Sequence, residues 1–248
     1  MYQFFTTPDQ IRKEEGIVTI TGPDVNHMKN VLRMQPGEEV AVSNGSDGLE
    51  YRCRIASYEE DSVNLDLLFV REENVELPAK VYLFQGLPKA DKMELIIQKA
   101  VELGVYEIIP VATDRAVVKL DQKKEKSKLE RWNAISEAAA KQSRRAIIPN
   151  VHGVMNFRQA IQYAETMQVR MIPYELAEGM EQTRAMFDQL DGKESIAVFI
   201  GPEGGFTREE IAAAKACGIE PISLGKRILR TETAGMTVLS ILMYRLEK

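Results

Sequence analysis

The sequence has few cysteines, few histidines and no long apolar run, and each shortage argues against a class of protein. Cys53 and Cys217 are the only cysteines among 248 residues and form no paired motif, so neither a disulfide scaffold nor a cysteine zinc site is expected. His27 and His152 are the only histidines and lack metal-ligand spacing, so we expect no metal. The apolar stretch at 196–200 is far shorter than a membrane span, and the N-terminus lacks signal-peptide features. We therefore expect a cytoplasmic protein with no membrane partner.

The rest of the composition is that of a folded globular protein. Hydrophobic residues make up 44% of the chain and charged residues 28%, which excludes wholesale disorder and fibrous structure. At usual domain sizes, this length corresponds to one large domain or two modest ones. The net charge of −5 argues against simple electrostatic attraction of the whole protein to nucleic acid.

Positive charge is nevertheless concentrated in one segment. Residues 115–145 hold ten Lys or Arg and four Asp or Glu, a net of +6, which leaves −11 for the rest of the chain. A basic stripe in an acidic protein can bind phosphate groups. The alternative is a solvated helix surface with ion pairs between successive turns. The sequence leaves both interpretations open.

The pattern of apolar residues changes along the chain. Residues 1–70 are typical of short strands around one helical pattern at 21–33, which suggests a small β-barrel. After a polar candidate linker at 71–79, strands alternate with helices, which predicts an α/β domain with a parallel sheet. The helices expected in this second part lie near 87–104, 123–145, 156–166, 180–190, 207–217 and 232–246.

The most informative segment is a glycine-rich loop that follows an apolar strand. The strand at 196–200 runs into GPEGG at 201–205, and Thr207 and Glu210 then form a capping box that opens a helix. Glycines after a strand let the backbone turn sharply and approach a ligand closely. Ligands of open α/β sheets bind beyond the carboxyl ends of the strands. Taken alone, however, this segment fits a cofactor loop and a plain tight turn equally well.

A second loop strengthens the interpretation as a cofactor site. SLGKRILRTETA at 223–234 also follows a strand and precedes a helix, and two such loops could clamp one flat ligand. The dinucleotide fingerprint G-x-G-x-x-G does not occur. The run from Gly218 to Lys226 matches a nucleotide-binding Walker A loop poorly, because Arg227 stands where Ser or Thr would hold magnesium. The chain also contains no nucleophilic serine elbow.

These two loops resemble the motifs of a known family. GPEGGFTREEI at 201–211 and SLGKRILRTETA at 223–234 closely resemble the RsmE-type 16S rRNA uridine methyltransferases of the SPOUT superfamily. Segments 27–33, 89–105 and 130–149 also match the family, so that the resemblance covers most of the chain.

The resemblance implies a fold and an assembly that periodicity alone does not show. It implies a PUA-like, RNA-binding β-barrel at 1–72. For residues 73–248 it implies a SPOUT-type methyltransferase domain, which is an α/β domain whose parallel sheet contains a trefoil knot. It also implies a homodimer. A knot would not be predicted on physical grounds, since threaded chains are rare.

The cofactor that the resemblance implies is S-adenosylmethionine, with the two loops surrounding its adenosine and methionine parts. Small and aliphatic side chains suit an adenine ring, while backbone N–H and C=O groups suit its polar edge. Pro173, Tyr174 and Glu175 are weaker candidates to complete this pocket. The implied cofactor-binding residues are Ile200, Gly201, Pro202, Glu203, Gly204, Gly205, Leu224, Gly225, Ile228, Leu229 and Thr231.

The implied reaction is methyl transfer to N3 of a uridine in the decoding region, near the 3′ end of 16S rRNA. The substrate would be this RNA or the 30S ribosomal subunit. Arg230 is the candidate to stabilise negative charge on the uracil oxygens. Glu232 is either the acceptor of the N3 proton or a favourable acid in the first turn of a helix. Glu203 is open to the same doubt, with bracing of the loop as its alternative role.

Candidate RNA-binding residues lie in three places. Arg144 and Arg145 end the basic helix, where their planar forks suit phosphate, although a cation is favourable there in any case. Lys89 and Lys92 open another helix, where the dipole does not favour cations, which suggests an anionic partner. The remaining two candidates lie on the basic side of the pattern at 21–33. The full set is Lys29, Arg33, Lys89, Lys92, Arg144 and Arg145.

Two further hypotheses stay open. The chain could be a non-catalytic RNA-binding protein with a PUA-like barrel, which affinity for S-adenosylmethionine would distinguish from an enzyme. It could also be a SPOUT methyltransferase that acts on another RNA position, such as a ribose 2′-hydroxyl or a tRNA guanine. Mapping the modified nucleotide would separate that enzyme from one acting on uridine N3.

Overall fold

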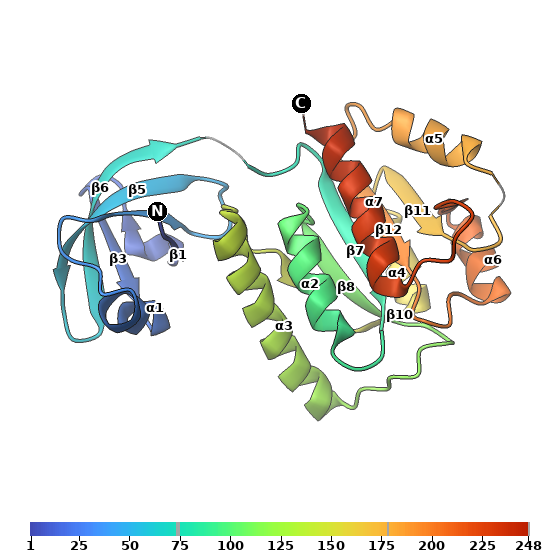
Figure 1. The fold of residues 1–248 in the computed structure, drawn as a ribbon, viewed down its shortest axis with the longest axis horizontal. Helices are drawn as coiled ribbons and strands as arrows, with labels where there is room; N and C mark the ends of the chain where they lie inside the picture. The colour runs from blue at the N-terminus through green and yellow to red at the C-terminus, as the bar shows by residue number, and fades with distance from the viewer. Residues whose placement is uncertain (73–74, 178, 248) are drawn as a thin grey trace. The chain divides into compact units, whose positions relative to one another are not determined.

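The computed structural model describes residues 1–72, 75–177 and 179–247. These residues divide into two compact units (Figure 1). The first unit contains residues up to 76 together with 140–148, and the second contains 77–139 together with the residues from 149 onward. The predicted linker at 71–79 and the predicted domain boundary at 72/73 both involve residues 73–74, which lie outside the described residues.

The first unit is built on one curled sheet. Its strand order is β1-β4-β5-β6-β3-β2, in which β1 and β4 are parallel and the other pairs antiparallel. The Thr6 hydroxyl, just after β1, donates to the carbonyl of Thr19 in β3 at 2.7 Å. The sheet therefore curls into a half-barrel, in keeping with the expected barrel. Its strands are β1 Gln3–Phe5, β2 Ile11–Arg12, β3 Ile17–Thr21, β4 Glu39–Ser43, β5 Glu50–Tyr58 and β6 Ser62–Arg71.

The core of this unit follows from strand alternation. Along β5, Tyr51, Cys53 and Ile55 are buried while their neighbours are more exposed, because successive side chains of a strand point to opposite faces. The predicted helix at 21–33 is shorter than expected. The helical turn α1 Pro23–Asn26 runs into the wider turn η2 His27–Val31. A further short helix, η1 Pro8–Gln10, was not predicted.

The second unit contains the expected parallel sheet. Its strand order is β10-β8-β7-β12-β11-β13, with the short β9 also paired to β8. The central strands are apolar along almost their whole length, because helices cover both faces of the sheet. Two of its strands, β9 and β10, are only two residues long. The strands are β7 Lys80–Gly86, β8 Glu107–Ala112, β9 Asn150–Val151, β10 Met155–Asn156, β11 Val169–Pro173, β12 Ser195–Ile200 and β13 Glu220–Ile222.

Five helices besides the long α3 pack around this sheet. Helices α4 and α6 share one apolar core with Phe84 and Phe199 of the central strands, and the rings of these two residues stack. Helices α2 and α7 pack against each other in front of the sheet in Figure 1. No helix among the described residues is long and apolar enough to span a membrane. The helices are α2 Lys92–Glu102, α3 Gln122–Ser143, α4 Phe157–Ala164, α5 Glu181–Asp188, α6 Arg208–Ala216 and α7 Thr231–Leu246.

The last part of the chain returns from the edge of the sheet to its centre. Strand β13 pairs with β11 at the edge, and the next helix, α7, contacts the central strand β12. Segment 223–230 therefore crosses the carboxyl end of the one intervening strand, β11. This parallel sheet with its returning C-terminal helix agrees with the α/β domain that the resemblance implies. The connection after β7 leads toward one edge of the sheet, and the connection after its neighbour β12 leads toward the other edge. Open α/β sheets bind ligands at such a switch point, beyond the carboxyl ends of the strands.

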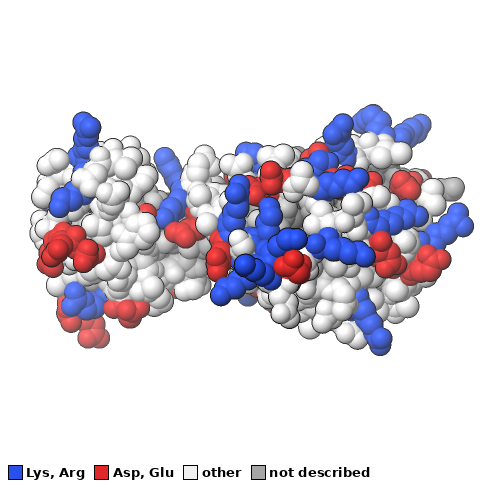
Figure 2. All heavy atoms as spheres, turned by 90° about the horizontal axis from the view of Figure 1, so that it is seen from below, with Lys and Arg blue, Asp and Glu red and all other residues white. Residues whose placement is uncertain are grey.

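The face of the second unit seen from below is rich in positive charge. Figure 2 shows many Lys and Arg side chains there, on the side of Figure 1 at which α2 and α3 begin. Several cations of α3 have acidic partners, such as Lys128, which lies 3.6 Å from Asp91 and 3.8 Å from Glu94. Others on the same helix, Lys123 and Lys126, are exposed and have no ion-pair partner among the described residues. Ion pairs thus occupy part of the basic segment, and phosphate binding by the rest stays a prediction.

Candidate functional site

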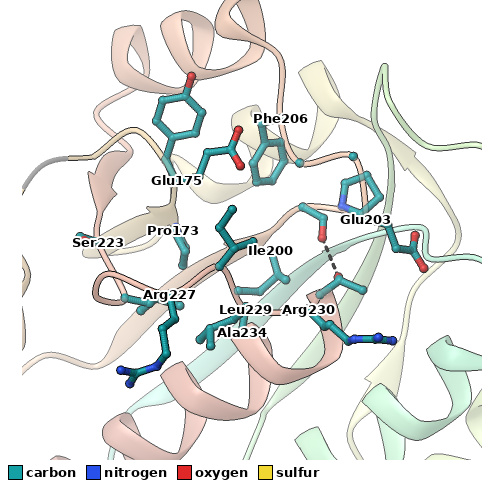
Figure 3. Close-up of a pocket in the computed structure, with 18 of the residues that line it drawn as sticks. Pro173, Glu175, Ile200, Glu203, Phe206, Ser223, Arg227, Leu229, Arg230 and Ala234 are labelled. Atoms are coloured by element: carbon teal, nitrogen blue, oxygen red, sulfur yellow. Dashed lines mark hydrogen bonds between the residues drawn. The ribbon is translucent and has the colours of Figure 1, made fainter.

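A pocket of about 410 Å³ lies beyond the carboxyl ends of β11, β12 and β13, where the start of α7 closes it. A volume in this range is typical of small-molecule sites. Figure 3 shows aliphatic Ile200 and Leu229 near its centre, and Glu175 and Phe206 toward one end. The lining residues are Lys92, Pro173, Tyr174, Glu175, Ile200, Gly201, Pro202, Glu203, Gly204, Gly205, Phe206, Ser223, Leu224, Gly225, Lys226, Arg227, Ile228, Leu229, Arg230, Thr231 and Ala234.

Every predicted cofactor-binding residue is among these lining residues, and so is Arg230. The three weaker candidates at 173–175 line the pocket as well. Glu232 is not a lining residue, although its carboxylate lies 3.4 Å from Lys92, which is one. The structure therefore brings together what the sequence placed in three separate loops.

The glycine loop 201–205 is packed so closely against neighbouring segments that glycine is required at the contacts. A Cβ at Gly86, the last residue of β7, would lie 2.7 Å from the backbone nitrogen of Pro202. A Cβ at Gly204 would lie 3.0 Å from Cβ of Arg115, whose guanidinium donates to the Gly204 carbonyl at 2.9 Å. Gly205 adopts a positive φ of 65°, which favours glycine. The loop is thus packed from two sides.

The helix after the loop is capped as the sequence predicted. The Thr207 hydroxyl accepts from the backbone N–H of Glu210, and the Glu210 carboxylate accepts from the N–H of Thr207. The second oxygen of Glu210 accepts from the backbone N–H of Asp114 at 2.9 Å. This buried carboxylate therefore also anchors the segment after β8, from which Arg115 reaches the glycine loop.

The second loop is held at both of its ends. The backbone N–H of Ser223 donates to the Thr183 hydroxyl, which donates in turn to the carbonyl of Ser223, both at 3.0 Å. At the other end, the Thr231 hydroxyl lies 2.6 Å from the carbonyl of Gly201 (Figure 3). Between them, Gly225 has a φ of 102° and Ile228 is 85% exposed. The two pocket loops are thus joined directly through Thr231 and Gly201.

One lysine holds two carboxylates at the side of the pocket. Lys92 Nζ lies 3.0 Å from Glu203 and 3.4 Å from Glu232, and the side chains of these acids are 27% and 16% exposed. The hydrogen bond to Glu203 is the main reason that the pKa of Lys92 is raised. Burial by itself would raise the pKa of Glu203, but hydrogen bonds from Lys92 and from backbone N–H groups outweigh it and lower this pKa. Lys92 and Glu203 are therefore both charged at neutral pH.

Arg230 is placed differently from these three residues. It is exposed, it lines the pocket, and its backbone caps the start of α7. The structure describes no ion pair between its guanidinium and any residue within the described ranges. Figure 3 shows it extending on the same side of the pocket as Glu203, while Arg227 extends on the opposite side. Its guanidinium is thus free to meet a ligand that carries negative charge.

The candidate RNA-binding residues fall into two groups. Lys89 and Lys92 lie beside the pocket of the second unit, where the backbone N–H of Lys89 donates to Glu203. The other four candidates belong to the first unit, in which an ion pair of 2.9 Å between Asp24 and Lys141 joins α1 to segment 140–148. These four are Lys29, Arg33, Arg144 and Arg145.

Neighbouring Arg144 and Arg145 have opposite environments. Arg144 is exposed and has a positive φ of 59°, a conformation that Arg33 shares with a φ of 55°. Such backbone is strained in non-glycine residues and is often found at functional sites. The Arg145 side chain is 4% exposed and forms an ion pair with Glu76, and its carbonyl accepts from Gln3 at 2.7 Å. This placement favours a structural role for Arg145.

Sequence reasoning missed several residues of the site. Gln85 is the one polar residue in an otherwise apolar stretch of β7, which was an available signal. Arg115 gave no signal, because its contact with Gly204 joins residues far apart in the sequence. Phe206, Ser223, Lys226, Arg227 and Ala234 also line the pocket, and each lies within or beside a predicted motif. Among the described residues, no group of three His, Cys, Asp or Glu side chains is arranged to hold a metal.

Comparison with known proteins adds independent findings. A family described as "RNA methyltransferase domain" matches residues 75–243, and one described as "RNA methyltransferase PUA domain" matches residues 20–68. The chain is 39% identical to ribosomal RNA small subunit methyltransferase E of Bacillus subtilis strain 168, over 97% of this chain and 94% of that protein. The protein of the same name from Synechocystis is 34% identical, over 96% and 76%.

A solved structure resembles the whole chain. It is a ribosomal RNA small subunit methyltransferase E from Neisseria gonorrhoeae bound to S-adenosyl methionine. The TM-score is 0.83 with 29% sequence identity, covering 98% of this chain and 97% of that one. The likeness extends over both units, and not only over the residues that line the pocket.

Proposed function

Because this chain belongs to the RNA methyltransferase family that includes ribosomal RNA small subunit methyltransferase E, we propose that it methylates 16S rRNA at N3 of a uridine. The methyl donor is S-adenosylmethionine, and the target lies in the decoding region near the 3′ end of the RNA. The observation that carries the proposal is the pocket at the carboxyl ends of β11, β12 and β13, which brings together both matching loops and Arg230.

The residues of this pocket fit the donor. Aliphatic side chains of Ile200, Leu224 and Leu229 can sandwich a flat adenine ring, while the exposed backbone of the two loops offers hydrogen bonds to its edge. The volume of about 410 Å³ suits a ligand of nucleoside size. When bound, the sulfonium of S-adenosylmethionine supplies an already activated methyl group. The chain must then align the uridine and manage its N3 proton.

Arg230 is the residue we assign to the charge that develops on uracil. When N3 loses its proton, negative charge spreads to the ring oxygens, and a fixed guanidinium nearby stabilises it. Arg230 suits this role because it lines the pocket and has no ion-pair partner within the described ranges. The planar fork of arginine can also meet two acceptors at once.

We assign Glu232 as acceptor of the N3 proton. Glu203 is the poorer acceptor because its hydrogen bonds with Lys92 and with backbone N–H groups lower its pKa. Glu232 lies in the first turn of α7, two residues after Arg230, and its distance from Lys92 is longer, at 3.4 Å. Glu203 is then left to brace the glycine loop through Lys89 and Lys92.

RNA contact is assigned to exposed cations on both units. Lys89 and Lys92 lie beside the pocket, and Lys29, Arg33 and Arg144 lie on the first unit. Arg145 remains a candidate only if RNA displaces Glu76, its present partner. On this proposal residues 1–72 contribute RNA binding and residues 73–248 carry out methyl transfer, while Lys89, Lys92 and Arg144 of the latter range add RNA contacts.

We further propose that the enzyme is a cytoplasmic homodimer that acts on the 30S subunit. Exposed apolar side chains of the second unit, Ile228 at 85% and Tyr244 at 80%, would be covered by a second copy. Sedimentation velocity of the purified chain distinguishes the dimer from a monomer. An rRNA substrate agrees with a cytoplasmic location, where bacterial ribosomal subunits are found.

The decisive experiment is transfer of a labelled methyl group from S-adenosylmethionine to 30S particles that lack the modification, followed by nucleoside analysis. We expect 3-methyluridine as the product. Arg230→Ala should lower turnover about 100-fold, as loss of one stabilising donor does elsewhere, while donor affinity falls far less. Arg208→Ala, which removes an exposed arginine at the start of α6, is the matched control.

Each other outcome has a distinct meaning. If a different methylated nucleoside appeared, the target of the enzyme would be another RNA position and not N3 of uridine. Donor binding without transfer to 30S particles would show that this subunit is the wrong substrate. Failure of the intact chain to bind the donor would overturn the enzyme assignment and leave a non-catalytic RNA-binding protein.

A further inference from the structure

Gln85 is a fully buried polar side chain next to the pocket, and the function proposed above does not use it. It is 0% exposed and lies in the central strand β7. Its amide nitrogen donates two hydrogen bonds of 2.9 Å, one to the carbonyl of Gly86 and one to the hydroxyl of Thr231. That hydroxyl lies 2.6 Å from the carbonyl of Gly201. Three elements, β7, α7 and the end of β12, therefore meet at one hydroxyl group.

The direction of each hydrogen bond in this chain is determined by chemistry. The Gly201 carbonyl can only accept, so the Thr231 hydroxyl must donate to it and accept from the Gln85 amide. Turning the amide over would place its oxygen against the Gly86 carbonyl, which is a second acceptor, so this orientation is disfavoured. In the observed orientation Gln85 Oε1 is buried and has no hydrogen-bond partner among the described residues.

A neutral side chain with two N–H donors is what this place requires. A lysine or arginine would bring a buried charge, and a hydroxyl would supply only one donor. A buried acceptor without a hydrogen-bond partner is unfavourable. The Oε1 atom of Gln85 is such an acceptor, whereas both N–H groups of its amide form hydrogen bonds. The receiving end is equally constrained. Pro202 has no N–H, so the carbonyl of Gly201 is the one polar group of that peptide.

We propose that Gln85 is a positioning residue for methyl transfer. It acts through the Thr231 hydroxyl, which fixes the Gly201 carbonyl and thereby holds the glycine loop 201–206 against the start of α7. Thr231 and Gly201 both line the pocket, whereas Gln85 does not. Its effect therefore falls on donor binding by way of the two loops. The inference rests on the proposed function, because it assigns these loops to the methyl donor.

The first test compares two substitutions of Thr231 in the full-length protein. Thr231→Val keeps the shape and removes the hydroxyl, and we expect the dissociation constant for S-adenosylmethionine to rise about tenfold, a typical effect of one lost hydrogen bond. Thr231→Ser restores the hydroxyl and should recover most of that loss. Thr237→Val is the matched control, because this hydroxyl of the same helix bonds only to the carbonyl of Thr233, away from the pocket. Equal affinity of the valine and serine variants would overturn the proposal.

The second test uses pH to switch hydrogen-bond donation by the side chain at position 85 on and off. A buried Gln85→Glu carboxyl has a raised pKa, and it can donate to Thr231 only when it is protonated. Donor affinity of this variant should therefore improve as pH falls from about 8.5 to about 6. Gln85→Met cannot donate at any pH and should stay weak throughout. A Gln85→Glu variant whose pH profile matches that of Gln85→Met would overturn the inference, since a purely space-filling residue predicts this result.

A third readout separates this inference from the proposed function. Hydrogen–deuterium exchange of peptides that cover 201–206 is measured without any ligand. Faster exchange in Thr231→Val than in Thr231→Ser supports the link even if the intact chain binds no S-adenosylmethionine, a result that would overturn the proposed function alone. Equal exchange in the two variants overturns the link, whatever the chain binds.

Discussion

The two ends of the parallel sheet both gather charged and aromatic residues, but those residues are used differently. At the amino end, His152 lies 3.0 Å from Glu107, and the Tyr163 hydroxyl donates to the other oxygen of Glu107 at 2.9 Å. Burial, and then this bond to Glu107, raise the pKa of Tyr163. At the carboxyl end, Lys92 and Glu203 line a pocket of about 410 Å³, together with the backbone of two loops.

This difference shows that a cluster of ionisable groups does not by itself mark a site. The amino-end groups contact one another and the ring of Tyr82, which packs edge-on to Tyr163, so Glu107 already has Tyr163 and His152 beside its two oxygens. At the carboxyl end, Arg230 lines the pocket, and its guanidinium has no ionic partner in the described ranges. Loop backbone, open volume and an unpaired cation distinguish the functional end of the sheet.

The strongest way to break the comparison is to fill the close approach at the carboxyl end. We expect Gly86→Ala to displace the glycine loop, because its new Cβ would lie 2.7 Å from backbone of Pro202, which cannot rotate away. Overpacking of this kind costs about 1–3 kcal/mol of folding stability. The dissociation constant for S-adenosylmethionine should rise more than about tenfold. Calorimetric titration and thermal unfolding of the variant measure both effects.

Gly153→Ala is the matched control, because this glycine follows a strand of the sheet, β9. Its new Cβ would meet only a side-chain oxygen of Glu125, at 3.4 Å. We expect it to leave donor binding unchanged. If Gly86→Ala bound the donor as tightly as Gly153→Ala, the close packing of β7 against the loop would have no role in the site.

A second substitution sharpens the comparison by removing the cation that Glu203 and Glu232 share. The ionised Glu203 carboxylate contributes stability above its ordinary pKa of 4.5, and this is lost as pH falls through its lowered folded value. In Lys92→Met burial is no longer opposed by the lysine, so the pKa of Glu203 should rise. Donor affinity should then weaken between about pH 7 and pH 5, where the intact protein stays constant.

Calorimetric titration at several pH values measures this shift. Lys99→Met is the control, because this lysine of the same helix pairs with Glu102 and not with the pocket acids. A flat profile for Lys92→Met would show that Glu203 does not depend on the lysine for its charge.

A feature could be predicted from the sequence when the residues that form it lie close together in the chain. The glycine loop, the capping box of Thr207 and Glu210, and the alternation of strands and helices are local patterns, so they could be found in the sequence. That the two loops could clamp one ligand was inferred from their place between a strand and a helix, and the family resemblance then implied which ligand it is. The link from Gln85 through Thr231 to Gly201 spans most of the second unit, and no local pattern encodes such a contact.

The sequence also could not predict which charged side chains are buried. Arg144 and Arg145 are adjacent and identical in type, yet one is exposed and the other forms an ion pair with Glu76. Only the path of the chain after α3 decides which of them turns inward. The predicted helix at 21–33 proved shorter for a related reason. The chain leaves the helical conformation by Arg33, whose φ is positive.

The smallest expected effect concerns the amino end, where the comparison predicts stability without function. Tyr163→Phe removes the hydrogen bond to Glu107 and keeps the ring that packs against Phe84 and Tyr82. Loss of one partly buried hydrogen bond should lower the free energy of unfolding by about 1 kcal/mol, while turnover and donor affinity stay constant. Urea unfolding and methyl-transfer assays measure the two quantities separately. A fall in turnover without loss of stability would mean that the two ends of the sheet are coupled. Polar clusters whose members lie against one another could then no longer be set apart from functional ones on that ground.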